Sequence, residues 1–127
     1  MRPKRIVITI NKAKATIQFS GRLGFNMDAI ELMQMANRKS FFLAQDEENE
    51  EILYLMPQND LEGDAKLAKA GSYYYLNVGD AFKNMGIKYK EYTVMYEVEK
   101  AEYEGSDIFV LNNKRSIKRK DKETDSN

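Results

Sequence analysis

The sequence contains no cysteine, no histidine and no tryptophan, and only two of its 127 residues are proline. Without cysteine there can be no disulfide bond, no thiol nucleophile and no Cys/His zinc site, and without histidine there is no imidazole general base. Catalysis would have to use carboxylates, lysine, tyrosine, serine or threonine. No such set stands at a recognisable spacing, so we expect a protein that is not an enzyme and that needs neither a metal nor another cofactor.

Long apolar runs are also missing. The run over residues 6–10 is only five residues long and is interrupted by Thr9, whereas a membrane-spanning helix needs about 20 apolar residues and a signal peptide about 7 to 15. We therefore expect a soluble, cytoplasmic protein with no membrane partner. The length favours one domain over residues 1–112, followed by a disordered basic tail over residues 113–127.

Charges are strongly segregated along a chain whose net charge is zero. Residues 1–39 hold eight basic residues against two acidic ones, whereas residues 40–65 hold eight acidic residues and no basic one. The last fifteen residues are basic again, with six basic residues against three acidic ones. A positive region of this kind can steer a polyanion towards the protein, although such charges often do no more than keep a surface solvated.

Hydrophobic periodicity in the first half predicts strands around one short helix. Alternation over residues 5–10 and 15–20 predicts a hairpin with two lysines at its tip. A period of three to four residues predicts a helix over residues 27–36, capped by Asn26. Residues 40–44 and 52–56 are apolar on both faces and are joined by an acidic loop, which is typical of strands in a barrel or at a subunit interface. That loop lacks the glycine and ligand spacing of a calcium loop.

The second half repeats this order of elements. At an offset of 52 residues, Asp28-Ala29-Ile30 aligns with Asp80-Ala81-Phe82, and Met33 aligns with Met85. We therefore predict an α+β fold: a β-rich, barrel-like domain of two similar strand-strand-helix-hairpin halves, over residues 5–57 and 65–112. The halves would pack about a pseudo-twofold axis.

Met85-Gly86-Ile87-Lys88, followed by Glu91 and Thr93-Val94-Met95, looks like a helix-ending turn and the strand after it. With the order of elements, this segment resembles the AbrB-like (SpoVT-AbrB type) swapped-hairpin DNA-binding family. The resemblance covers roughly residues 15–56 and 72–111, and Gln34 stands where that family has its turn glycine. It implies a DNA-binding protein, such as a small transcriptional regulator or an antitoxin-like protein.

In that family, basic residues of the N-terminal hairpin and of the loop before the helix face DNA, and Lys12, Lys14 and Arg22 fall in the matching places. Such side chains would contact phosphates and release counterions. The candidate nucleic-acid-binding residues are Lys4, Arg5, Lys12, Lys14, Arg22, Arg38 and Lys39.

Two alternatives stay open at this point. Tyr73-Tyr74-Tyr75 alternates so that Tyr73 and Tyr75 share one face, and exposed rings beside cations form stacking platforms for single-stranded nucleic acid. Alternatively, the doubly apolar strands 41–44 and 52–56 form the interface of a homo-oligomer, and the protein is an interaction or assembly module that binds no nucleic acid.

Overall fold

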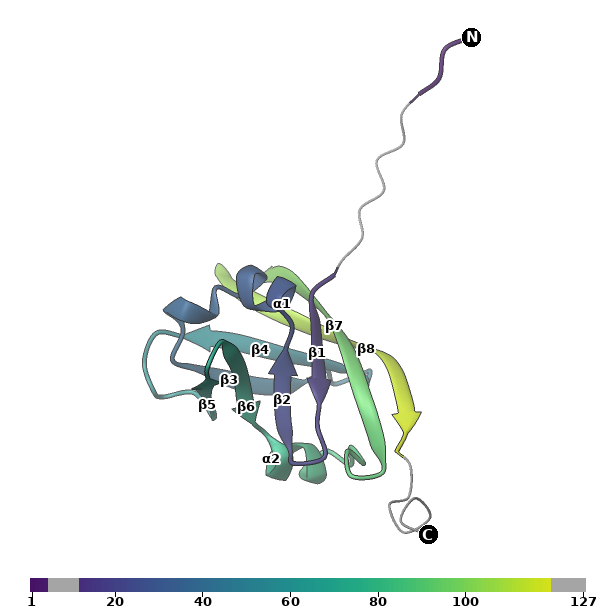
Figure 1. Ribbon diagram of the computed structural model, residues 1–127. Coiled ribbons are helices and arrows are strands. Elements are labelled where there is room, and N and C mark those ends of the chain that lie inside the picture. Colours follow the sequence, from purple (N-terminus) through teal and green to yellow (C-terminus); the bar gives the residue numbers. More distant parts are fainter. Residues whose placement is uncertain (5–11, 120–127) are drawn as a thin grey trace.

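The computed structural model describes residues 1–4 and 12–119. Within these ranges the chain forms eight strands, two six-residue α-helices and one short 3-10 turn (Figure 1). In chain order the elements are β1 (Lys14–Ile17), β2 (Arg22–Phe25), α1 (Met27–Leu32), η1 (Met35–Asn37), β3 (Ser40–Gln45), β4 (Ile52–Gln58), β5 (Ala65–Ala70), β6 (Tyr73–Asn77), α2 (Gly79–Asn84), β7 (Tyr92–Tyr103) and β8 (Ser106–Lys118).

The strands close into an antiparallel barrel in the order β1-β2-β6-β5-β3-β4-β8-β7. The expected barrel is confirmed, but the predicted α+β class is wrong, because the fold is nearly all β. The helical periodicity over residues 27–36 predicts a longer helix than the structure contains. Gln34 adopts a left-handed conformation with φ of 51°, which ends α1 after Leu32 and leaves only the 3-10 turn beyond it.

The two halves of the chain occupy equivalent places in the barrel. Every pair of neighbouring strands is still a neighbouring pair when β1 is exchanged with β5, β2 with β6, β3 with β7 and β4 with β8. The pair β1-β7 becomes β5-β3, and the pairs β2-β6 and β4-β8 each become themselves. The two helices are offset by 52 residues and lie at opposite ends of the barrel (Figure 1). Each ends beside a left-handed residue, Gln34 after α1 and Gly86 after α2.

The first hairpin is placed differently from the sequence-based expectation. β1 pairs with β2 through a turn over residues 18–21 and with β7 on its other side. Gly21 closes this turn with a positive φ of 86°, a conformation that favours glycine. The lysines at positions 12 and 14 are therefore at the start of β1 and not at a hairpin tip. The strand predicted over residues 5–10 lies outside the described residues.

The core fills the inside of the barrel with alternate residues of the strands. β1, β4 and β7 each show the alternation of buried and partly exposed positions expected of a strand with one buried face. Phe82 of α2 closes one end and packs edge to face against Tyr96, with ring centroids 6.3 Å apart. β8 continues to Lys118, six residues into the range expected to form a disordered tail. No helix in the described part of the chain is long and apolar enough to cross a membrane.

Candidate nucleic-acid interface

One half of the barrel wall carries basic residues and no carboxylate. The neighbouring strands β1, β2, β6 and β5 contain Lys14, Arg22, Lys66 and Lys69, and no residue that the structure places in these four strands is Asp or Glu. Lys69 pairs with Tyr74, whose ring packs against the core, so Lys69 lies on the inward side of the wall and the outward cations are Lys14, Arg22 and Lys66. We call the outer surface of these strands the cationic face. These strands supply no carboxylate of their own, but Glu97 of the adjacent strand β7 forms an ion pair with Lys14. The positive potential of this face is therefore only partly cancelled, which favours an anionic partner.

Aromatic rings stand on the cationic face. Leu76 of β6 is fully buried and Tyr74 packs against the core, so alternation turns Tyr73 and Tyr75 outward. The two outward rings are stacked, with centroids 5.7 Å apart and planes 24° from parallel. The guanidinium of Arg22, on the adjacent strand β2, lies over the ring of Tyr75 at 4.3 Å from its centroid. The result is a continuous stack of one cation and two aromatic rings.

Gly24 makes room for this stack. The ring of Tyr73 reaches across β2, and a Cβ at position 24 would lie 1.9 Å from the Tyr73 hydroxyl oxygen. On the far side of β2 the side-chain amide of Gln18 donates a hydrogen bond to that hydroxyl. Neither Gly24 nor Gln18 was predicted from the sequence as a site residue. A glycine inside a strand marks a site of close approach, and Gly24 could have been found by that signal.

A second aromatic residue with cations around it lies in the β1-β2 turn. Phe19 is 57% exposed, and the side-chain cations of Lys90 and Arg119 lie 5.7 and 5.8 Å from the centre of its ring. Arg119 is held in place because its guanidinium donates to the carbonyl oxygens of Tyr89 at 2.9 Å and Ile17 at 3.3 Å. An exposed ring with a fixed cation beside it can stack a base and contact its phosphate.

Both clusters involve the same turn. Gln18 and Arg22 close this turn through a backbone hydrogen bond of 2.9 Å, and Phe19 lies between them. Gln18 donates a hydrogen bond to Tyr73, and Arg22 covers Tyr75, so both outward rings of β6 contact residues at the two ends of this turn. We call Phe19, Arg22, Tyr73 and Tyr75 the stacking platform.

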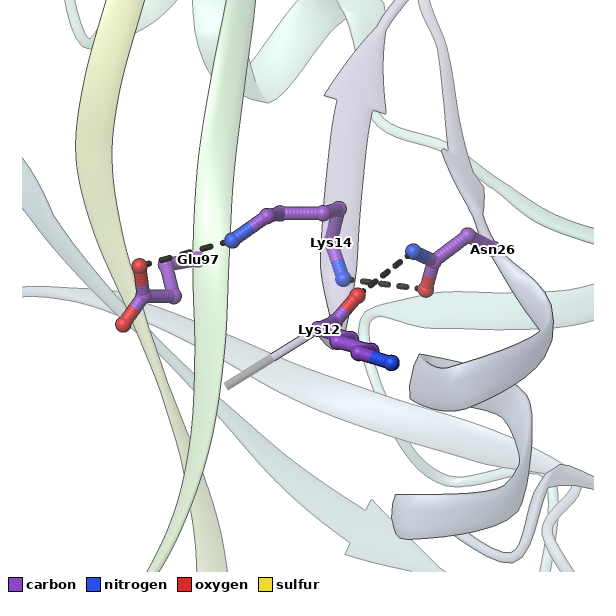
Figure 2. Close-up of polar contacts among 4 residues, drawn as sticks. All are labelled: Lys12, Lys14, Asn26 and Glu97. Carbon is purple, nitrogen blue, oxygen red and sulfur yellow. Dashed lines mark hydrogen bonds and ion pairs between the residues drawn. The ribbon is translucent and has the colours of Figure 1, made fainter. Parts of the chain in front are cut away.

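The lysines that the family resemblance pointed to lie at the other end of β1. Lys14 donates to the Glu97 carboxylate on β7 with an Nζ to Oε2 distance of 3.4 Å (Figure 2). Asn26, the N-cap of α1, accepts from the backbone N–H of Lys14 and donates its side-chain amide to the carbonyl of Lys12. The side chain of Lys12 is exposed and points away from Glu97. The charge of Lys14 is thus partly neutralised by a carboxylate.

The other predicted residues are dispersed. Arg38 donates from Nε to the carbonyl of Met33 at 3.1 Å, which satisfies a carbonyl at the end of α1. Lys39 is exposed, and its backbone pairs with Gln58 and Leu67. Lys4 is exposed, and Arg5 lies outside the described residues. Of the predicted set, only Arg22 belongs to the stacking platform.

No protein-family model matches this chain, and neither a curated protein nor a solved structure does.

Proposed function

We propose that the protein binds single-stranded nucleic acid on its cationic face, with bases stacked on the stacking platform. The observation that carries this proposal is a pair of cation-aromatic clusters, one at Phe19 in the β1-β2 turn and one at Arg22 and Tyr75 directly after it. Aromatic side chains recognise any base through its π-face, and neighbouring cations contact the backbone phosphates. Base stacking of this kind needs no catalytic group.

Single strands suit this surface better than a duplex does. In a duplex the faces of the bases are already stacked on one another, so an aromatic side chain gains nothing unless a base is exposed. Duplex recognition through the N-terminal hairpin would rest on Lys12 and Lys14, and the charge of Lys14 is shared with Glu97. The AbrB-like resemblance and a role in transcriptional regulation stay predictions that rest on the sequence.

The test is fluorescence anisotropy with a labelled oligothymidine of about 15 nucleotides, a length within the site size of known single-strand binders. Phe19→Ala is expected to weaken binding by about 10-fold, because loss of one stacked base costs about 1 to 3 kcal/mol. If Arg22, Lys90 and Arg119 contact phosphates, the affinity should fall about 20-fold between about 50 and about 200 mM salt.

The matched control is Tyr103→Ala. Tyr103 is 58% exposed, close to the 57% of Phe19, but it lies on β7, outside the cationic face. This variant should leave the oligonucleotide affinity unchanged. Absence of binding at about 50 mM salt would overturn the proposal. Tighter binding to a duplex of the same sequence, lost in Lys12→Ala but kept in Phe19→Ala, would move the function to the lysines at the start of β1.

A further inference from the structure

The other half of the barrel wall, formed by β3, β4, β8 and β7, has a different chemistry. Its outer surface is hollowed into a groove of about 560 Å³. The floor of the groove is apolar and comes from all four strands, through Ala44, Tyr54, Met56, Ala101, Ile108 and Val110. These side chains occupy outward positions, because their neighbours Leu53, Leu55, Phe109 and Leu111 are fully buried inside the barrel.

The rim of the groove is acidic. Asp46, Glu47 and Glu48 of the β3-β4 loop and Glu102 of β7 line it, and within residues 1–4 and 12–119 no lysine or arginine does. The loop is held in a fixed shape, since the Asp46 carboxylate accepts from the backbone N–H groups of Glu48 and Asn49 at 3.0 and 2.9 Å. Tyr54, from the groove floor, also donates its hydroxyl to Asp46. The acidic residues are therefore held against the apolar floor.

We infer that this groove binds a peptide segment of a partner protein that carries both basic and apolar side chains. An apolar floor favours aliphatic or aromatic groups, and a rim with four carboxylates and no cation selects lysine or arginine at the flanks. Tyr103 stands at the edge of the groove with 58% of its surface exposed, and partly exposed tyrosines of this kind are frequent anchors in protein interfaces.

The charge of the rim favours a basic peptide over two other possible occupants of the groove. A second copy of the chain docked groove to groove would bring two acidic rims together, which costs affinity. A nucleic acid would be repelled by the same carboxylates. The groove and the stacking platform therefore serve partners of opposite charge on different halves of one barrel.

The probe is a fluorescein-labelled peptide of about ten residues with alternating lysine and leucine, a length suited to a surface groove. We expect it to bind the full chain at least 10-fold more tightly than a lysine-serine peptide of equal charge or a glutamate-leucine peptide of equal apolarity. Tyr103→Ala should weaken binding about 10-fold. The double substitution Glu47→Gln and Glu48→Gln should weaken it about 5-fold, and by less at higher salt.

Matched controls separate this surface from general acidity. The first control is Phe19→Ala, since Phe19 is as exposed as Tyr103 but lies on the opposite half of the barrel. The second is the double substitution Glu31→Gln and Glu62→Gln, which removes two exposed carboxylates outside the groove. Both should leave the peptide affinity unchanged. In amide NMR spectra, the peptide should shift the signals of Tyr54, Met56 and Val110. Equal binding of the lysine-serine peptide, unchanged affinity in Tyr103→Ala, or shifts confined to other strands would overturn the inference.

The same variants test the competing occupant. If sedimentation equilibrium shows a dimer that Tyr103→Ala abolishes, the groove is an interface between copies of this chain and the inference is wrong. Failure of oligonucleotide binding would leave the inference standing, because Phe19→Ala and Tyr103→Ala report on the two surfaces independently.

Discussion

The ring of Tyr73 on β6 lies across Gly24 on β2, and the absence of a side chain at position 24 allows it. The hydroxyl of Tyr73 passes over that glycine to accept a hydrogen bond from Gln18, the first residue after β1. The outer face of β2 at Gly24 is therefore covered by the ring of Tyr73, which comes from the neighbouring strand β6. This contact connects β6 and β2 with the β1-β2 turn and orients the ring that stacks on Tyr75.

Gly24→Ala should displace Tyr73 without unfolding the barrel. The clash is with the far end of a side chain, which can rotate away, and alanine is tolerated in a strand at least as well as glycine. We expect the free energy of unfolding to change by less than about 1 kcal/mol. If the proposed function is correct, the affinity for oligothymidine should fall several-fold. A denaturant titration and an anisotropy titration of the same variant measure both quantities.

Gln34 and Gly86 hold equivalent places after the two helices, and both have positive φ, at 51° and 80°. A left-handed conformation costs an L-residue about 1 to 2 kcal/mol, which glycine avoids. Gln34→Gly should therefore raise the free energy of unfolding by about 1 kcal/mol, and Gly86→Ala should lower it by a similar amount. Nothing lies within 4 Å of a Cβ built on Gly86, so its loss would reflect the backbone alone. A loss of stability in Gln34→Gly would contradict this explanation.

Sequence periodicity predicted most of the strands, because alternate residues of a barrel wall face a core that excludes water. Residues 40–44 and 52–56 were expected as strands, and they lie in β3 and β4. The helix over residues 27–36 was overestimated because a single backbone conformation at Gln34 ended it. The period of three to four residues in the sequence continued beyond that point, from Gln34 to Arg38, and gave no sign of the break.

The candidate site was harder to predict than the fold. Tyr73 and Tyr75 were placed together on one face by alternation alone, and the structure shows them stacked. The cations around Phe19, however, come from positions 90 and 119, far from it in the sequence. The neutralisation of Lys14 depends on Glu97 in a strand 83 residues away. Such contacts form only when the barrel closes and brings distant segments together, so no local sequence pattern predicts them.

Ser40 should be the most sensitive small polar residue of the fold. It is fully buried at the start of β3, where its hydroxyl donates to the carbonyl of Asp60 at 2.7 Å and accepts from the N–H of Gly63 at 2.9 Å. Ser40→Ala leaves two backbone groups without this partner and should cost about 1 to 3 kcal/mol of unfolding free energy. Ser106→Ala, at an exposed position, is the control and should have little effect. Thermal and urea unfolding measure the difference.

The bond between Asp46 and Tyr54 should make stability depend on pH at the acid end. The Tyr54 hydroxyl donates to the Asp46 carboxylate, and this hydrogen bond, with those from backbone N–H groups, lowers the pKa of Asp46. Because the pKa of Asp46 is lower in the folded protein than in the unfolded chain, its ionised form stabilises the fold. This stabilisation is fully present above the pKa of an unfolded Asp, about 3.9, and is lost as the pH falls through the lower pKa of the folded protein.

Tyr54→Phe removes this bond and provides the measurement. The hydrogen bond to Asp46 raises the pKa of Tyr54. The contribution of this bond to the free energy of unfolding is therefore also constant as the pH rises to about 10, the ordinary pKa of tyrosine. The melting temperature of the wild-type chain should therefore exceed that of Tyr54→Phe by a constant amount at intermediate pH. Below about pH 4 the gap should close, because a protonated Asp46 no longer favours the bond. A gap that persists at lower pH would show that Tyr54 stabilises the groove floor through packing alone. Tyr103→Phe, at an exposed position on the same wall, should show no such dependence.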